Sequence, residues 1–212
     1  SLRRADAVIA TGAGLEQRVH EIEPETPCTH LFDIPSSRTE PQPDEVQSIR
    51  ERLQSHPEEA LATYVGSFAT YQGIDLLFEA APLSIKQNPS LRLVIIGGSE
   101  SEIQERKAQL QGTDVSDRVT FLGKVDPELL PSYLAASDIL LSPRISGHNT
   151  PLKLLDYFKA GGAIVATDME ANRLLMDEST AVFGPPTPEG FASALAQLSL
   201  DPEKRQTLAG KG

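Results

Sequence analysis

Short apolar runs alternate with longer amphipathic stretches along most of this chain. The apolar runs predict strands at residues 63–65, 91–96, 119–122, 139–142 and 163–167, and a weaker one at 181–183. The stretches between and after them predict helices at 73–87, 102–111, 127–136, 151–160 and 188–198. Strands that are apolar throughout are buried on both faces, which is typical of a parallel sheet. We therefore expect an α/β fold, a Rossmann-like parallel sheet with helices on both faces.

The chain before residue 61 has a different pattern. Residues 5–11 and 29–34 predict short strands, and residues 15–22 predict a helix between them. Residues 35–44 (PSSRTEPQPD) are rich in proline and polar side chains, as in a linker. An amphipathic helix follows, with Val46, Ile49 and Leu53 on one face. This pattern divides the chain into segments 1–34, 35–60 and 61–212.

Charge and composition limit the ligands that this chain can bind. Asp and Glu number 30 against 19 Lys and Arg, a formal net charge of −11. Such a surface repels nucleic acid and anionic membranes, so a small anion binds only where cations and free amides converge. The only cysteine is Cys28, which is compatible with a cytoplasmic protein, and no apolar run approaches the roughly 20 residues of a membrane span. Because the chain begins without a methionine, we interpret it as a piece of a longer protein.

An open parallel sheet binds ligands beyond the carboxyl ends of its strands. The site is therefore expected after Val65, after Leu122 and after Ser142. The densest segment is 142–167, SPRISGHNTPLKLLDYFKAGGAIVAT. Thr150 is predicted to cap a helix whose first residue is Pro151. A helical wheel then buries one side of this helix, made of Leu152, Leu154, Leu155 and Phe158.

Cations and a carboxylate gather around the predicted helix start. Lys153 and Asp156 lie on its second face, and the loop before it carries Arg144, His148 and Asn149. A helix start with free amides, a guanidinium and an ammonium suits a diphosphate, and a carboxylate one turn later suits a ribose diol. The alternatives are an ordinary solvated helix face for Lys153 and Asp156, a surface arginine and a loop histidine.

Residues 142–168 resemble the donor-binding segment of family-4 glycosyltransferases (glycosyl transferases group 1). The resemblance is greatest to the branch with Ser-Pro-Arg, Asn-Thr-Pro-x-Lys, and then an acidic or polar residue and a tyrosine. Residues 64–81 (YVGSFATYQGIDLLFEAA) are similar to the first strand–loop–helix of that donor domain, and 119–143 to its base-binding segment. More weakly, 5–19 (ADAVIATGAGLEQRV) is similar to the end of the acceptor domain.

The resemblance implies the donor half of a GT-B enzyme, in which two Rossmann-like domains face each other across a cleft. Segment 1–34 would then be a remnant of the acceptor domain or an interdomain strand–helix, 35–60 a linker and helix, and 61–212 the nucleotide-sugar-binding domain. It implies retaining transfer of a sugar from a nucleotide diphosphate to an unknown acceptor, which is a glycan, a lipid or a small molecule. The missing N-terminal domain would supply the acceptor site and any peripheral contact with a membrane.

The resemblance also implies roles for single residues. Asp156 would hold the ribose, and Arg144 and Lys153 would bind the diphosphate and act in catalysis. Other donor-binding positions carried over are Gly66, Ser67, Lys124, Val125, Asn149, Thr150, Pro151 and Leu152. Three further donor positions depart from the family pattern. His148 replaces a glutamate that binds the sugar, and Phe68 and Gln72 replace an arginine and a lysine.

Other readings are a non-catalytic sugar-nucleotide-binding module and a sugar-nucleotide epimerase of the same architecture. A dehydrogenase is disfavoured because no G-x-G-x-x-G is present, and a phosphate-loop NTPase because no Gly-Lys-Ser/Thr occurs. The sequence also lacks an Asp-x-Asp pair. We therefore expect no metal and no cofactor besides the donor itself.

Overall fold

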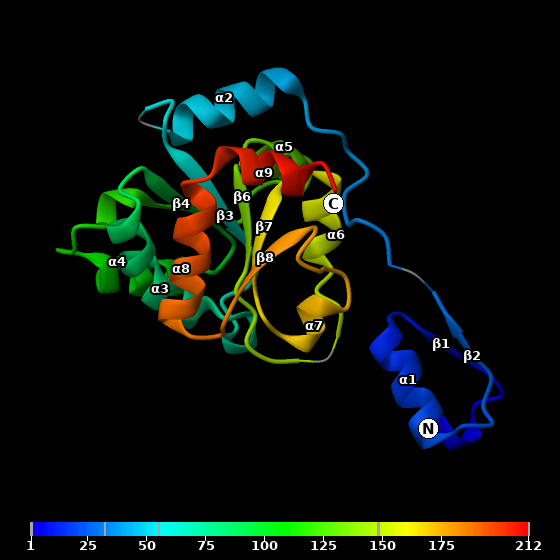
Figure 1. Ribbon diagram of the computed structural model, residues 1–212. Helices are drawn as coiled ribbons and strands as arrows, with labels where there is room; N and C mark the ends of the chain where they lie inside the picture. Colours follow the sequence, from blue (N-terminus) through cyan, green and yellow to red (C-terminus); the bar gives the residue numbers. More distant parts are fainter. Residues whose placement is uncertain (1, 32, 55, 148, 212) are drawn as a thin grey trace.

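The larger part of the chain folds around a six-stranded parallel sheet (Figure 1). The computed structural model describes residues 2–31, 33–54, 56–147 and 149–211. The strand order is β5-β4-β3-β6-β7-β8. The strands are β3 (Ala60–Val65), β4 (Leu91–Ile96), β5 (Val119–Gly123), β6 (Ile139–Ser142), β7 (Ala163–Thr167) and β8 (Ala181–Gly184). The predicted α/β class with a parallel sheet is confirmed.

Helices cover both faces of this sheet. On one face, α3 (Ile74–Gln87), α4 (Glu100–Leu110), α8 (Pro188–Ser199) and α9 (Pro202–Ala209) contribute to one core cluster. On the other face lie α2 (Pro43–Leu53), α5 (Leu130–Ala135) and α6 (Lys153–Lys159). Successive residues of β4 show the division, since Leu93 and Ile95 pack with the first group and Val94 and Ile96 with the second. Burial on both faces explains why the strands are apolar throughout.

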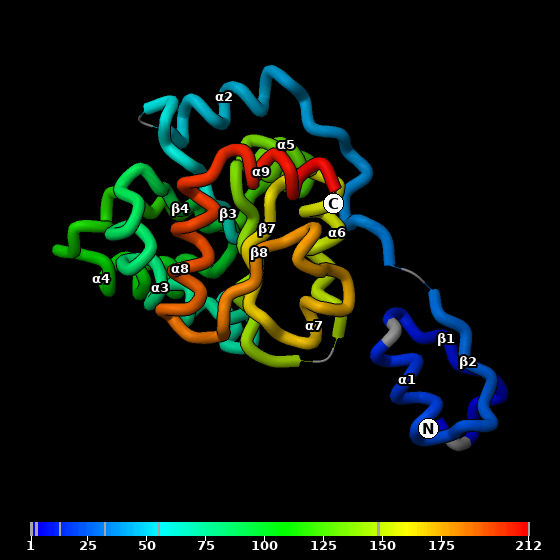
Figure 2. The backbone as a smooth tube through the Cα atoms, viewed as in Figure 1, coloured from blue at the N-terminus to red at the C-terminus, as the bar shows by residue number. Residues whose placement is uncertain are grey.

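A small unit precedes the sheet. It contains η1 (Leu2–Arg4), β1 (Val8–Ala10), α1 (Ala13–Ile22) and β2 (Cys28–His30), and its two strands pair in parallel. The chain then runs without helix or strand, among the described residues, to α2 (Figure 2). Ile9 and Leu31 are mostly exposed on this unit. No helix among the described residues has the length and apolar content needed to cross a membrane.

Several elements differ from the sequence prediction. Strands β4, β6 and β7 have the predicted bounds, whereas β3 begins earlier, at Ala60, and β1 and β2 are shorter than predicted. The short helices α7 (Glu170–Arg173) and η2 (Thr70–Gln72), the 3-10 turn η3 (Ser116–Arg118) and α9 were not predicted. Leu83 of α3 is exposed, because the buried face of this helix runs through Ala81, Ser84 and Ile85.

Candidate functional site

A cavity of about 500 Å³ opens at the carboxyl ends of β3, β4 and β5. Its walls come from the loops that follow these strands and from the start of α5. The lining residues are Val65, Gly66, Ser67, Ile96, Gly97, Gly98, Ser99, Glu102, Lys124, Val125, Pro127 and Leu130. The structure thus brings together Gly66 and Ser67 with Lys124 and Val125, as expected for two separate segments of one site.

Glycines allow the loops after β3 and β4 to touch. Gly97 has a φ of +116°, and a Cβ placed there would lie 2.0 Å from the carbonyl oxygen of Gly66. Gly98 has a φ of +75° and lies against the ring of Phe68. Phe68 is buried and also packs edge-on against Phe78, so this predicted donor-binding residue belongs to the core. The two glycines therefore allow the loops after β3 and β4 to pack closely at the cavity, where a side chain would not fit.

The rim of the cavity also contains Ser99 and Glu102, which are not among the predicted donor-binding residues. Ser99 and Glu102 form a capping box at the start of α4, and the backbone N–H of Ser99 donates to the Glu102 carboxylate at 2.7 Å. This hydrogen bond holds the pKa of Glu102 below its usual value, and nearby Lys124 adds to the shift. The Ser-x-x-Glu spacing after the predicted strand is the signal that identifies this rim.

Lys153 lies at the carboxyl end of β3. Its Nζ donates to the carbonyl oxygen of Val65 at 3.3 Å and lies 4.6 Å from the centre of the Tyr64 ring. A Cβ on Gly66 would be 3.5 Å from this ammonium nitrogen. Burial lowers the pKa of Lys153 to about 7, and repulsion from Arg144 adds to the effect. An amine of this kind gains its proton readily when an anion arrives beside it.

Arg144 is only 7% exposed, although it follows a strand end. Its Nε donates to the carbonyl oxygen of Ser146 at 2.7 Å, and its guanidinium lies 5.5 Å from the centre of the Tyr71 ring. A Cβ on Gly147 would come within 2.2 Å of the guanidinium, so the loop folds closely over it. The structure places this second cation near Lys153, as its effect on the pKa of Lys153 shows.

The carboxylate of Asp156 is already occupied by the linker. Ser36 donates to it twice, from its backbone N–H at 2.8 Å and from its hydroxyl at 2.5 Å. The ammonium of Lys159 fastens the same segment by donating to the carbonyl oxygens of Ser37 and Thr39, both at 3.1 Å. Both carboxylate oxygens of Asp156, the residue predicted to hold the ribose, therefore accept hydrogen bonds from Ser36, which lies far away in the sequence.

The predicted start of the helix at Thr150 is wrong. Helix α6 begins at Lys153, and its N-cap is Leu152, with no side-chain cap. The preceding turn is closed instead by the Leu154 N–H, which donates to the Pro151 carbonyl oxygen at 2.9 Å. This later start leaves Leu152 outside the helix and 54% exposed, whereas the wheel had placed it in the core.

Tyr157 takes the central buried position in α6. Its hydroxyl donates to the carbonyl oxygen of Leu141 at 3.1 Å and accepts from the Val65 N–H at 3.3 Å. Burial raises the pKa of this phenol. Tyr157 therefore ties α6 to the ends of β3 and β6 and keeps Lys153 and Asp156 in place beside them.

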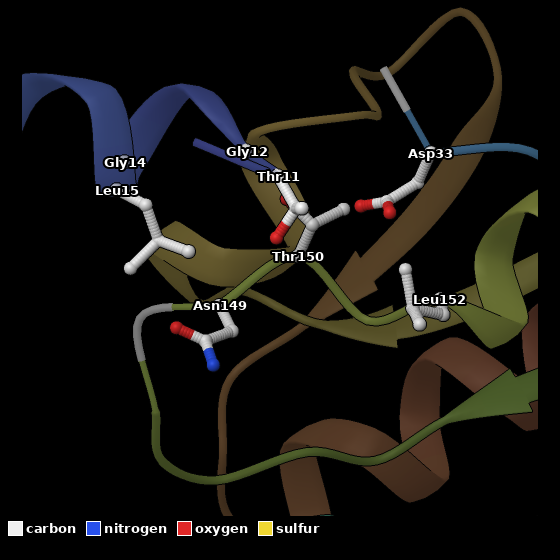
Figure 3. Close-up of a pocket in the computed structure, with 8 residues that line it drawn as sticks. All are labelled: Thr11, Gly12, Gly14, Leu15, Asp33, Asn149, Thr150 and Leu152. Carbon is white, nitrogen blue, oxygen red and sulfur yellow. The ribbon is translucent and has the colours of Figure 1, made fainter. Parts of the chain in front are cut away.

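The remaining predicted residues are distributed between two regions. Gln72 ends η2, and its Oε1 is buried with no hydrogen-bond partner in the part of the chain that the structure describes. Asn149, Thr150 and Leu152 line a separate hollow of about 140 Å³, shown in Figure 3. The prediction for His148 lies outside the described residues.

Across residues 2–31, 33–54, 56–147 and 149–211, no three His, Cys, Asp or Glu side chains are grouped as metal ligands.

Comparison with known proteins decides the family. The family described as "Glycosyl transferases group 1" matches residues 45–212, which is most of the chain. The chain belongs to this family. Its described relatives include the phosphatidyl-myo-inositol mannosyltransferase of Mycolicibacterium smegmatis, 28% identical over 137 residues, which are 63% of this chain and 34% of that protein. The alpha-D-kanosaminyltransferase of Streptomyces kanamyceticus is 28% identical over 76% of this chain and 42% of its own length.

Solved structures share the fold of this chain. Anabaena HepE in complex with UDP and glucose superposes with a TM-score of 0.80 at 16% identity, covering 98% of this chain and 57% of that one. The C-terminal domain of a group 1 glycosyl transferase from Francisella tularensis, LpcC, has a TM-score of 0.69 at 19% identity and covers 84% of this chain and 93% of its own. The chain thus spans less than half the length of the two curated relatives above, and most of the isolated domain.

Proposed function

We propose that this chain binds the nucleotide diphosphate sugar donor of a retaining glycosyltransferase. The observation that carries the proposal is the cavity lined by Gly66, Ser67, Lys124 and Val125, beside the partly buried amine of Lys153. Support comes from family membership and from HepE, a neighbour of the same fold whose structure holds UDP. The acceptor and the transfer step belong to a larger protein that contains a second domain.

The donor is placed along the carboxyl edge of the sheet. The base lies in the cavity against the backbone of Lys124 and Val125, between apolar Ile96 and Leu130. The diphosphate lies over Gly66 and Ser67, close to the amine of Lys153, which is 3.5 Å from the place of a Cβ on Gly66. The ribose diol reaches Asp156 once the hydrogen bonds of Ser36 are exchanged for its own.

Lys153 and Arg144 act on the leaving group. As the bond to the sugar breaks, negative charge grows on the diphosphate, and an ammonium fixed in a poorly solvated position stabilises that charge strongly. With a pKa of about 7, Lys153 takes up a proton as the anion binds. Loss of either cation is expected to lower turnover by on the order of 10²–10³ in a protein that contains both domains. These two cations do the work of a metal, so transfer is expected to persist in EDTA.

Nucleotide binding by the chain itself tests the proposal. Isothermal titration with UDP, GDP and ADP should give saturable binding of at least one of them. Lys153→Met should weaken that binding by about tenfold or more, because it removes a charge-assisted contact. Lys86→Met, at an exposed position on α3, is the matched control and should leave the affinity unchanged. Absence of binding to all three nucleotides, or equal affinities of the two variants, contradicts the proposal.

A further inference from the structure

The hollow in Figure 3 lies between the small N-terminal unit and the loop before α6. Thr11 and Asp33 face it from one side, and Asn149 and Thr150 from the other. The two sides nearly touch at Gly12, where a Cβ would lie 3.3 Å from the Thr150 hydroxyl oxygen. The hollow of about 140 Å³ is therefore assembled from segments that are far apart in the sequence.

The lining combines polar and apolar groups. Figure 3 shows the carboxylate of Asp33 turned toward Thr11 and Thr150. No described residue donates a hydrogen bond to that carboxylate, so its oxygens are available to a ligand. Exposed Leu15 and Leu152 complete the lining. Hydroxyl, amide and carboxylate groups facing apolar side chains suit a sugar ring, which has hydroxyls at its edge and C–H bonds on its faces.

The position of this hollow follows the order of the donor's parts. Lys153, the proposed diphosphate ligand, lies beside Gly66 of the nucleotide cavity. The residues just before it, Thr150 and Leu152, line the hollow. Base, ribose, diphosphate and sugar form a linear molecule, so the part beyond the diphosphate is the sugar. The hollow is lined by the residues that directly precede Lys153 in the chain, and this part of the donor fits there.

We propose that Asp33 and Thr11 bind hydroxyl groups of the transferred sugar and determine which sugar is accepted. This inference rests on the proposed function, because it needs a nucleotide bound in the larger cavity. A carboxylate accepts hydrogen bonds from two neighbouring hydroxyls, and loses them when a hydroxyl is absent or reversed. The N-terminal segment therefore takes part in the donor site.

The test compares a nucleoside diphosphate with its sugar derivatives on the full chain. Titrations use UDP with UDP-glucose, GDP with GDP-mannose and ADP with ADP-glucose. The variants are then measured with the pair whose nucleoside diphosphate binds most tightly to the unmodified chain. In the unmodified chain, the sugar derivative should bind about tenfold more tightly than the nucleotide alone. Asp33→Asn should reduce that ratio about tenfold, and Thr11→Val should reduce it by a smaller factor. Both should leave the affinity for the nucleotide alone unchanged.

Asp6→Asn is the matched control, since Asp6 is an exposed carboxylate of the same unit outside the hollow. Its ratio should equal that of the unmodified chain. An unchanged ratio in Asp33→Asn, or no gain from the sugar in the unmodified chain, overturns this inference and leaves the proposed function standing. Failure of every nucleotide to bind overturns both.

Discussion

The amine of Lys153 is held in a position where its charge is disfavoured. An ammonium that is shielded from water and has no carboxylate partner among the described residues is costly, and this cost, with repulsion from Arg144, lowers the pKa of Lys153 from 10.5 to about 7. Between these two values the unfolded chain binds one more proton at this residue than the folded chain does. Because stability rises with pH wherever the unfolded state holds more protons, Lys153 makes folding less favourable at pH 7 than at pH 9.

Lys153→Met is therefore expected to stabilise the chain near neutral pH. The gain in the free energy of unfolding over the unmodified chain should shrink by up to about 1.4 kcal/mol per pH unit as the pH rises from 7.5 to 9. Urea denaturation at several pH values measures it, with Lys86→Met as the control whose difference stays flat. If the difference in the free energy of unfolding between Lys153→Met and the unmodified chain does not change with pH, the Lys153 amine is charged in the folded chain and the prediction is wrong.

The sequence identified Lys153 and Arg144 as cations of one loop–helix unit, because their types and spacing are local properties. It did not indicate the lowered pKa of Lys153, because that shift comes mainly from burial, and the amine packs against Tyr64 and Val65 of β3. The Ser36 hydrogen bonds to Asp156 were equally hidden, because they join residues brought together only by the folded linker. The grouping of these two cations could thus be inferred from the local sequence, whereas the pKa of Lys153 and the hydrogen bonds of Asp156 could not.

Among the elements, the central strands were the most predictable. β4, β6 and β7 are apolar runs that end at glycine or at polar residues, so burial and local sequence agree on their bounds. The start of α6 was not predictable, because Thr150 and Pro151 favour an earlier helix start. In the folded chain, the segment before Lys153 follows a turn beside the N-terminal unit instead. Tertiary contact there prevails over local capping preference.

The contact between the loops after β3 and β4 predicts a sensitive glycine. Gly97→Ala combines a left-handed backbone cost of about 1–2 kcal/mol with a collision against the Gly66 carbonyl, because a Cβ would lie only 2.0 Å away. We expect a loss of at least about 3 kcal/mol in the free energy of unfolding. Gly112→Ala shares the positive φ but has no atom within 4 Å of its Cβ, so it should lose only the backbone part. Urea denaturation of both variants decides, and equal losses would contradict the predicted collision.

Ser36 of the linker already donates hydrogen bonds to the Asp156 carboxylate, so we expect it to compete with the ribose of a bound nucleotide for this residue. Ser36→Ala removes the hydroxyl that donates to the carboxylate and leaves the backbone donor in place. If a ribose diol must take over this carboxylate, the variant should bind the nucleoside diphosphate about three- to tenfold more tightly. Ser37→Ala is the control, since its hydroxyl accepts from the Thr39 N–H and does not contact Asp156. Weaker nucleotide binding by Ser36→Ala would show that Ser36 orients the carboxylate for the ribose.

For the whole molecule, the two proposed parts of the donor site lie in different units. The nucleotide cavity is lined entirely by residues after Ala60, and so are Lys153 and Arg144. The hollow for the sugar depends on Thr11, Gly12 and Asp33 of the N-terminal unit. That unit has one short two-stranded sheet and exposes Ile9 and Leu31, so it adds little stability of its own. Nucleotide binding and sugar recognition should therefore be separable by truncation.

A chain of residues 35–212 tests this division. It keeps the linker, α2 and the complete six-stranded sheet, and a C-terminal domain of the same fold has been crystallised alone from Francisella tularensis. We expect it to bind the nucleoside diphosphate within about threefold of the full chain, because no contact of the nucleotide cavity is lost. The sugar derivative should then bind no more tightly than the nucleotide alone, because the Asp33 carboxylate and the Thr11 hydroxyl are absent from this shorter chain. Calorimetry with both ligands measures the two quantities in one preparation. Loss of nucleotide binding itself would mean that the N-terminal unit shapes the whole donor site, and the division by unit would then be wrong.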